Sequence, residues 1–535
     1  ALPICDPQGF DPIGSNTGFT GTFDANGHTV DGLFIDRLQA DVVGLFGTTG
    51  VDSTVSNISI TNATMSGVRR VGTLAGDNRG TVSNVHVTTQ ITGKSPLTEG
   101  SPDSIGGVVG SNNGDVVASN ATVNISASDG SSIGGFIGAN DGKIVDSVVS
   151  GTLSVPDGSN VGGLVGSSSG SSDFVAIANA TADVTVSSPR GRGVGGLLGD
   201  GGNFVEVIES SATGTVSGKT NVGGLVGATE SDIFRSFATG NVEGNMTSGE
   251  NIGGLVGNSN GPVGNSSAFG NVTGNNSVGG FAGVVRDTFS GSEISASYSV
   301  GTVIGNSTVG GFAGKVSTIS VVDSYWDTEA SGTATATGTG PTTNITGLTT
   351  SELQGSAATE NTNLSFNPVW IATDGYPIHV WRVDDYELSV GQTTLDPGEM
   401  TASTVTLSLS DGSTTTATEP ADYSSTNTDS ITVDDGGQVT AAGSGSATLT
   451  AKASGFDDTL SLSVIAPSSP STSSSSSSTS DDDDDNESPE EPSQNETTTD
   501  EETTDGTTRS DSSAGSETDD RSEEHTSELQ SHAPI

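Results

Sequence analysis

The hexapeptide Val161-Gly162-Gly163-Leu164-Val165-Gly166 carries the pattern that decides the fold, because close variants of it recur along the first 314 residues. Its form is Val or Ile, then Gly-Gly, then Leu or Phe, an apolar residue and Gly. Copies follow one another about every 30 residues, and a fixed period of this length is typical of solenoid proteins. The copies begin at Val43, Val71, Ile105, Ile133, Val161, Val194, Val222, Ile252, Val278 and Val309, and the first two are degenerate.

A second pattern follows the hexapeptide, in which small or apolar residues occupy every second position. Such alternation is typical of a β-strand that turns one face inward, and small side chains suit a narrow interior. The alternation breaks at each Gly-Gly pair, where we expect a bend. One alternating series consists of Ser210, Ala212, Gly214, Val216 and Gly218, and it returns at 236–244, 266–274 and 297–305.

The two patterns predict an all-β protein, a β-solenoid of about ten repeats in which each repeat forms one coil. A single repeat buries almost nothing, whereas stacked repeats share backbone hydrogen bonds and continuous apolar ladders. The composition agrees, because 77 glycines and only 4% aromatic residues cannot fill a thick core. In this register Val222, Leu225 and Val242 point inward. A flexible Gly/Ser linker is the alternative, but linkers do not keep apolar residues in register.

The repeats resemble the GLUG motif of secreted and cell-surface proteins, represented here by Gly163-Leu164-Val165-Gly166. This resemblance implies a right-handed parallel β-helix over residues 1–320 and a surface or adhesive role, without naming a ligand. Family members carry more chain before the opening block, so we expect the sequence to be a fragment. Similar blocks open and close such proteins, and here they are Phe10–Gly14, Phe19–Asp24, Gly27–Val30, Ser324–Glu329, Gly347–Leu353 and Gly375–Pro377.

The three tryptophans of the chain, Trp326, Trp370 and Trp381, lie close together in the sequence. The last coil of a solenoid exposes apolar surface and an unpaired strand edge, which must be covered. We therefore expect residues 321–385 to form a C-terminal cap with one short helix at Ser351–Gln354. A sugar-binding aromatic patch is the alternative.

Residues 386–466 change to Thr- and Ser-rich alternation and resemble a bacterial group 2 immunoglobulin-like domain. The resemblance lies in Ile431–Val433, Gly437–Thr440 and Gly443–Leu449, and Tyr423 stands where that family often has Trp. It implies a small Ig-like β-sandwich, and the spacing of the alternating segments suits one.

The remaining residues are polar and have no apolar pattern. Residues 467–520, which include the run Asp481–Asp485, have the composition of a disordered acidic stalk. That run lacks the glycine turns of a preformed Ca²⁺ site, so we expect a solvated spacer. Residues 521–535 resemble the translation of a sequencing adapter and are treated as an artefact. We expect a membrane or wall anchor in a missing C-terminus.

The charge of the chain limits its partners. Sixteen basic residues face 65 acidic ones, for a net charge of −49, and no Lys/Arg cluster exists, so nucleic acid is not an expected partner. A surface this acidic suggests a halophilic source, because salt screens its self-repulsion. Cys5 is the only cysteine, which excludes an internal disulfide. Three histidines, His28, His86 and His379, precede the adapter-like segment without ligand spacing, so we expect no metal site and no cofactor.

No catalytic residue is predicted, and we expect a non-enzymatic extracellular or cell-surface protein, an adhesin or cell-envelope component that contacts glycans or proteins. The alternative is a secreted β-helix enzyme acting on polysaccharide, which would need clustered carboxylates with basic partners. Arg69-Arg70, Asp146, Arg190, Arg192 and Arg235 occupy irregular repeat positions instead. The Asn-x-Ser/Thr sequons, which suit a secreted glycoprotein, begin at Asn57, Asn62, Asn120, Asn124, Asn179, Asn245, Asn265, Asn271, Asn275, Asn306, Asn344, Asn363, Asn486 and Asn495.

Overall fold

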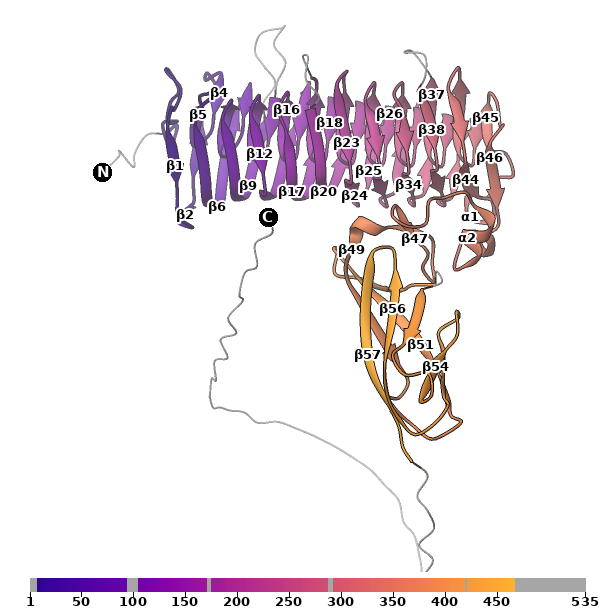
Figure 1. Cartoon of the computed structure of the whole chain (residues 1–535). Coiled ribbons are helices and arrows are strands. Elements are labelled where there is room, and N and C mark those ends of the chain that lie inside the picture. Colours follow the sequence, from indigo (N-terminus) through magenta and orange to yellow (C-terminus); the bar gives the residue numbers. More distant parts are fainter. Residues whose placement is uncertain (1–6, 94–103, 171–174, 287–291, 419–420, 467–535) are drawn as a thin grey trace, which may run out of the picture. The chain divides into compact units, whose positions relative to one another are not determined.

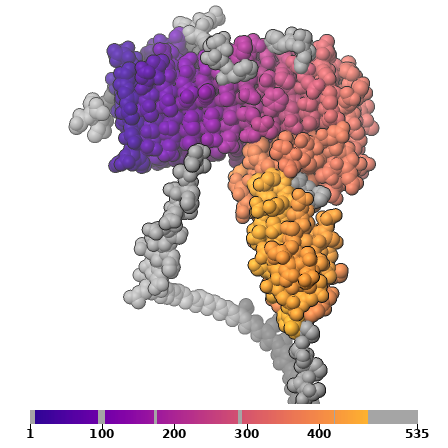
Figure 2. Space-filling model, viewed as in Figure 1, coloured from indigo at the N-terminus to yellow at the C-terminus, as the bar shows by residue number. Residues whose placement is uncertain are grey.

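The computed structural model describes residues 7–93, 104–170, 175–286, 292–418 and 421–466. Cys5, the stalk, the adapter-like segment and the sequons at Asn486 and Asn495 lie outside these residues. The described chain is almost entirely β-structure, and most of it is a parallel β-solenoid built from one 24-stranded and two 11-stranded sheets. Figure 1 shows the coils following one another in sequence order, from indigo to orange. The space-filling view shows them packed without gaps (Figure 2). The expected fold class is therefore confirmed for the solenoid.

Each repeat forms one coil, as expected. Ile133 pairs in parallel with Ile105 of the preceding repeat and with Val161 of the following one, and this register continues to Val309. These first positions of the hexapeptide lie in one narrow sheet. Its path consists of β4 (Val42–Val43), β7 (Arg70–Val71), β10 (Ser104–Gly106), β15 (Ser132–Gly134), β18 (Asp157–Gly162), β21 (Arg192–Gly195), β26 (Thr220–Gly223), β31 (Glu250–Gly253), β36 (Asn276–Gly279) and β41 (Ser307–Gly310).

The last two positions of the hexapeptide begin the second narrow sheet. The chain leaves the first sheet at Gly162 and enters the second at Val165, so the predicted bend lies at the Gly-Gly pair. The second narrow sheet consists of β5 (Phe46–Thr48), β8 (Ala75–Asn78), β11 (Val109–Asn112), β16 (Ile137–Asn140), β19 (Val165–Ser168), β22 (Leu198–Gly201), β27 (Val226–Thr229), β32 (Val256–Ser259), β37 (Ala282–Arg286), β42 (Ala313–Ser317) and β45 (Thr337–Thr339).

The alternating stretches form the broad, 24-stranded sheet. After the short strands of the first coil, the early coils contain long strands, and the later coils contain short ones. The early coils contribute β1 (Thr22–Asp24), β2 (Thr29–Asp31), β3 (Phe34–Asp36), β6 (Thr54–Gly67), β9 (Thr81–Gly93), β12 (Asp115–Val117), β13 (Asn120–Ala127), β17 (Ile144–Ser154) and β20 (Val175–Ser187). The later coils include β23 (Val205–Ile208), β24 (Ser211–Ala212), β28 (Asp232–Phe234), β29 (Phe237–Ala238), β34 (Ser267–Ala268), β39 (Tyr298–Ser299), β44 (Ser324–Asp327) and β46 (Ile345–Leu348).

In the interior, every second residue of the alternating segments faces inward, as predicted. Val222, Leu225 and Val242 are all 0% exposed, and the series from Ser210 to Gly218 is buried at every second position. The glycines of the hexapeptide are steric requirements. A Cβ on Gly163 would overlap the carbonyl oxygen of Gly196 in the next coil, and one on Gly166 would overlap the backbone at Ile133 in the preceding coil. Coils can stack this closely only where no side chain intervenes.

A corner recurs in the broad sheet, where the residue before a buried serine has left-handed backbone. At one corner Arg235 has φ 48°, the Ser236 Oγ–H donates to the Phe234 carbonyl at 2.9 Å, and the Ser236 N–H donates to Ser266 Oγ in the next coil at 3.3 Å. The serine thus satisfies backbone groups that the bend removes from the sheet. Buried corner serines are Ser119, Ser147, Ser210, Ser236, Ser266, Ser297 and Ser324.

A buried amide ladder runs through the early coils at the end of the second narrow sheet. Asn78 Nδ2 donates to Asn112 Oδ1 at 2.7 Å, and Asn112 Nδ2 donates to Asn140 Oδ1 at 2.8 Å. All three side chains are about 1% exposed. Thr49 and Ser168 bond to the two ends of the ladder. Each amide therefore donates in one direction and accepts from the other, which satisfies a buried polar column.

The solenoid continues beyond residue 320, because β44, β45 and β46 add to its sheets. The prediction of one short helix at 351–354 was wrong. A 3₁₀ turn, η1 (Thr350–Glu352), closes with a capping box from Thr349, and two short helices, α1 (Thr328–Ser331) and α2 (Ala357–Asn361), accompany it. A second 3₁₀ turn, η2 (Val380–Arg382), ends this region. Side-chain caps from Asp327 and Thr349 stabilise α1 and η1, and apolar periodicity does not reveal such caps.

The tryptophans take two different positions. Trp326 lies inside the last coils, where it joins the main apolar core beside Gly311. Trp370 and Trp381 belong to residues 364–382, which we name the clasp, and the clasp packs on the outward side of the broad sheet. Trp326 is 6% and Trp370 0% exposed, so an exposed sugar-binding patch built on them is excluded. Trp381 is partly buried, and its indole N–H donates to the Arg235 carbonyl at 2.8 Å.

The clasp covers one outward column of the broad sheet. Phe237, Ser267, Tyr298 and Tyr325 are in register on successive coils, with Ala238 and its counterparts facing inward. All four outward residues are nevertheless at most 5% exposed. The Tyr298 hydroxyl donates to the carbonyl of Pro377, which lies in the clasp between β47 (Trp370–Ile371) and β48 (Ile378–His379). Apolar burial and hydrogen bonds from side chains to main-chain carbonyls therefore hold the clasp on the later coils.

The described chain ends in two further sheets around a second apolar core. This core includes Leu388, Leu407, Leu449 and Leu462. One sheet contains β49 (Val383–Val390), β51 (Met400–Leu409), β52 (Thr414–Thr416), β54 (Ile431–Val433) and β55 (Gln438–Ala441). The other contains β50 (Thr394–Leu395), β53 (Asp422–Ser425), β56 (Gly445–Ala453) and β57 (Phe456–Val464).

Candidate functional site

The basic and acidic residues considered for an enzymatic site do not converge. Arg235 Nε lies 2.8 Å from Glu209 of the preceding coil. Arg70 and Arg79 share Asp77, at 3.3 and 2.9 Å. The others pair separately: Arg69 with Asp41, Arg190 with Asp157, and Asp146 as acceptor from Asn179, while Arg192 is exposed in β21. These are local contacts, within one coil for Asp77 and between neighbouring coils for the other pairs.

A hollow of about 260 Å³ in the later coils is acidic. Its lining includes Glu230, Asp232, Phe204 and Pro262. Asp232 pairs in register with Glu206 of the preceding coil. Burial raises the pKa of Asp232, and the negative charge of Glu206 adds to this effect. Two neighbouring carboxylates with one raised pKa are a feature of general acid–base sites.

The acidic hollow was missed from the sequence, although a signal exists. Glu206 and Asp232 each lie four residues before a corner serine, Ser210 and Ser236, so the repeat register places them side by side. A second carboxylate, Asp200, also has a raised pKa, caused first by burial and then by the charge of Glu230. Across the described residues, no group of three or more His, Cys, Asp or Glu side chains is arranged to hold a metal ion.

A second hollow, of about 300 Å³, is uncharged and lies in the early coils. A register shift between Ile60 and Ala63 of β6 opens it beside β9. Its lining consists of Asn62, Ala63, Thr64, Thr88, Thr89 and Gln90. Hydroxyl and carboxamide groups both donate and accept hydrogen bonds, so the hollow suits an uncharged polar ligand.

The uncharged hollow continues into a wider surface on the outward side of the broad sheet. We name it the hydroxyl face and define it by its outward Ser, Thr, Asn and Gln residues. They are Thr64, Ser66, Thr88, Gln90, Thr92, Thr122, Asn124, Ser126, Ser150, Thr152, Ser154, Thr185 and Ser187. Asp183, in register with Ser150, borders the face on β20. In the alternating segments, the residues between the inward positions face outward, and their polar character could have revealed this surface in the sequence.

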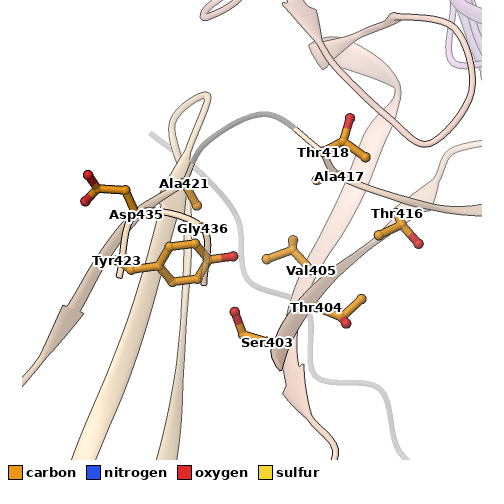
Figure 3. Close-up of a pocket in the computed structure, with 10 residues that line it drawn as sticks. All are labelled: Ser403, Thr404, Val405, Thr416, Ala417, Thr418, Ala421, Tyr423, Asp435 and Gly436. Carbon is orange, nitrogen blue, oxygen red and sulfur yellow. The ribbon is translucent and has the colours of Figure 1, made fainter. Parts of the chain in front are cut away.

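The third hollow, of about 190 Å³, belongs to the C-terminal sheets (Figure 3). Ser403, Thr404 and Val405 come from β51, and Tyr423 faces them from β53. The Ser403 hydroxyl donates to the Gly437 carbonyl at 2.8 Å. Asp435 contributes the single carboxylate of the lining, and this composition favours no particular chemistry.

The described sequons lie mainly on the surface. Asn57, Asn265 and Asn275 are partly buried, and the other nine are exposed. Asn57, Asn179 and Asn265 occupy the left-handed corner, with φ between 48° and 55°. Asn62 lines the uncharged hollow, and Asn124 belongs to the hydroxyl face. No described helix is long and apolar enough to cross a membrane.

Comparison with known proteins gives two partial similarities. Over 104 residues the chain is 42% identical to halomucin of Haloquadratum walsbyi, which is 19% of this chain and 1% of halomucin. Over 83 residues it is 40% identical to a putative Gly-rich membrane protein of Evansella cellulosilytica, which is 15% of this chain and 10% of that protein. No protein-family model matches the chain. The GLUG and immunoglobulin-like resemblances therefore rest on the residues quoted above.

Proposed function

We propose that this chain belongs to a non-enzymatic extracellular or cell-surface protein, an adhesin or cell-envelope component of a halophile. One observation carries the proposal: the solenoid presents an outward array of uncharged polar side chains on β9, β13 and β17 of three successive coils. The partial similarity to halomucin and to a Gly-rich membrane protein supports a surface or secreted location. Glycans or proteins of the envelope are the proposed partners, and nucleic acid is not, because of the net charge of −49.

Finer features belong to the same proposal. We propose a right-handed winding of the coils and an immunoglobulin-like identity for the C-terminal sheets, on the resemblances already described. N-glycosylation is proposed at the exposed sequons other than Asn62 and Asn124.

The location is tested on intact cells that express the full protein. Brief protease treatment should remove the solenoid from the cell surface while a cytoplasmic marker protein stays intact. Retention of full-length protein until the cells are lysed would overturn the surface location.

A polysaccharide-acting enzyme is the second candidate, favoured by the acidic hollow and the raised pKa of Asp232. The test measures reducing ends released from acidic and neutral polysaccharides by the parent and by Asp232→Asn. Turnover that Asp232→Asn abolishes would establish the enzyme and overturn the proposal of a non-enzymatic protein. If the parent releases no reducing ends, the result supports the non-enzymatic proposal.

A further inference from the structure

We propose that the hydroxyl face binds an uncharged polysaccharide, with the sugar chain running from coil to coil along the solenoid. The inference deepens the proposed function, and rests on it, by naming the surface and the class of partner. It starts from an unbroken register. Thr64, Gln90, Asn124, Thr152 and Thr185 form one column across five coils.

Regular spacing makes this surface a repeating one. Neighbouring strands of a sheet lie about 4.8 Å apart, and alternate residues of a strand about 6.6 Å apart. The outward positions of 88–92, 122–126 and 150–154 therefore form a grid of three columns on β9, β13 and β17. A partner with its own linear repeat can place equivalent groups on several coils at once, so that weak contacts add up through effective concentration.

Hydrogen bonds within the face fix its side chains before a partner arrives. The Thr152 hydroxyl donates to Asn124 Oδ1 at 3.2 Å, and Thr122 and Ser150 share a hydrogen bond of 3.2 Å. A hydroxyl and a carboxamide each have further donor or acceptor capacity. Binding to an ordered array costs less side-chain entropy than binding to a mobile one.

Charge decides the class of partner. The chain carries 65 acidic residues, yet the grid on β9, β13 and β17 holds none of them. Asp183 of β20 and Asp36 of β3 lie at the edges of the face, in register with Ser150 and Ser66. An anionic polymer would be repelled by the rest of the molecule, and a cation would favour carboxylates. An apolar partner would find few contacts, since the large exposed apolar side chains beside the face are Val148 of β17 and Phe34 of β3, which is in register with Thr64. Uncharged sugar hydroxyls complement the hydroxyls and carboxamides of the face.

The uncharged hollow gives the face a place to hold one sugar unit more closely. It lies at the β6–β9 end of the columns, and Thr64, Thr88 and Gln90 belong to both the hollow and the face. Its volume of about 300 Å³ is at the lower limit of small-ligand sites. Asn62 in its lining is held by a 2.8 Å hydrogen bond to Asp31.

The experiment measures capture of the full chain, made without N-glycosylation and kept in high salt, by insoluble cellulose and chitin. Soluble dextran oligomers of increasing length serve as competitors, and alginate as an anionic polysaccharide. We expect capture by at least one neutral polysaccharide, competition that strengthens with oligomer length, and no competition by alginate. Failure of both neutral solids to capture the protein, or competition by alginate alone, would overturn the inference.

Variants locate the binding. Asn124→Asp and Gln90→Glu add a charge to the face and should each weaken capture at least tenfold. Asn113→Asp, in an exposed turn before β12, makes the same change of charge outside the face and should leave capture unchanged. Equal capture by all variants would overturn the location. A protein found on the cell surface that captures no neutral polysaccharide refutes this inference alone, whereas an intracellular location refutes the proposed function beneath it.

Discussion

At the scale of single residues, this fold depends on side chains that are absent or small. The hexapeptide glycines sit where a Cβ would overlap backbone of the next coil, so the motif is a packing requirement. The corner imposes the opposite demand, because residues with a Cβ occupy left-handed backbone there. Ala118 has φ 48° and Arg235 has the same value. Such positions cost energy unless the residue is Gly or Asn.

Replacing Ala118 with Gly should stabilise the solenoid. Ala118 is exposed and left-handed, and that conformation costs an ordinary L-residue about 1 kcal/mol or more. Part of this gain is offset by the greater freedom of Gly in the unfolded chain. Ala121→Gly, at a buried position of β13, should destabilise by about 0.5–1 kcal/mol. Thermal unfolding of the two variants should move in opposite directions; a lower melting temperature for both would contradict the strain at the corner.

Leu225→Asp tests the interior register. Leu225 is 0% exposed, so the variant would bury a carboxylate without a partner and lose several kcal/mol. Leu225→Met keeps the volume and should cost about 1.5 kcal/mol or less. Denaturant unfolding measures both. Equal stability of Leu225→Asp and the parent would show that this side chain does not face the core.

At the scale of elements, ladders of polar side chains specify how the strands of neighbouring coils are aligned. Apolar ladders specify this alignment less strictly, because their side chains are similar from position to position. The amide ladder needs each asparagine both to donate and to accept. The clasp and the broad sheet are held together differently, by aromatic rings of the clasp that pack over an outward column of the sheet. His379 lies at its centre: its ring is 4.0 Å from that of Trp370, and its Nε2 is 2.8 Å from the Asn265 carbonyl.

Asn112→Asp should destabilise the early coils at neutral pH. A carboxylate can accept from Asn78 but cannot donate to Asn140 Oδ1, so two oxygens would face each other in a buried site. We expect a loss of about 2 kcal/mol. Protonation at low pH restores a donor, so the difference from the parent should shrink as pH falls. A difference independent of pH would argue against the ladder's direction.

The clasp should loosen in acid. Burial lowers the pKa of His379 to about 3, whereas the unfolded chain has the ordinary value of 6.5. The neutral form is therefore favoured by folding, and its contribution is complete above pH 6.5 and declines as pH falls toward 3. The slope approaches about 1.4 kcal/mol per pH unit. Tryptophan fluorescence reports the change through Trp370 and Trp381. In His379→Gln this pH dependence should vanish; an unchanged profile would exclude His379 as its source.

At the scale of the whole molecule, the sequence predicted the parts that depend on periodicity. Repeat length, one coil per repeat, inward parity and the bend at Gly162-Gly163 all follow from apolar and glycine spacing. The clasp did not, because Trp370 meets Tyr298, and Trp381 meets Phe237, through contacts more than 70 residues apart in the chain. The acidic hollow and the hydroxyl face were also missed, since polar outward residues carry no apolar signal; their register becomes meaningful only when the coils are stacked.

The net charge of −49 leads to the final prediction, that salt stabilises the folded chain. Few cations are available to offset the charge, because 16 basic residues face 65 acidic ones and several of the basic ones are already paired across coils. Stacking places these charges close together, whereas unfolding separates them, so repulsion weighs more heavily on the folded state. The Debye length falls from about 30 Å at 0.01 M salt to about 3 Å at 1 M. The melting temperature should therefore rise steeply between these concentrations with NaCl and KCl alike. A salt-independent melting temperature would argue against a halophilic source, and a rise with sulfate alone would indicate enhanced apolar burial instead of screening.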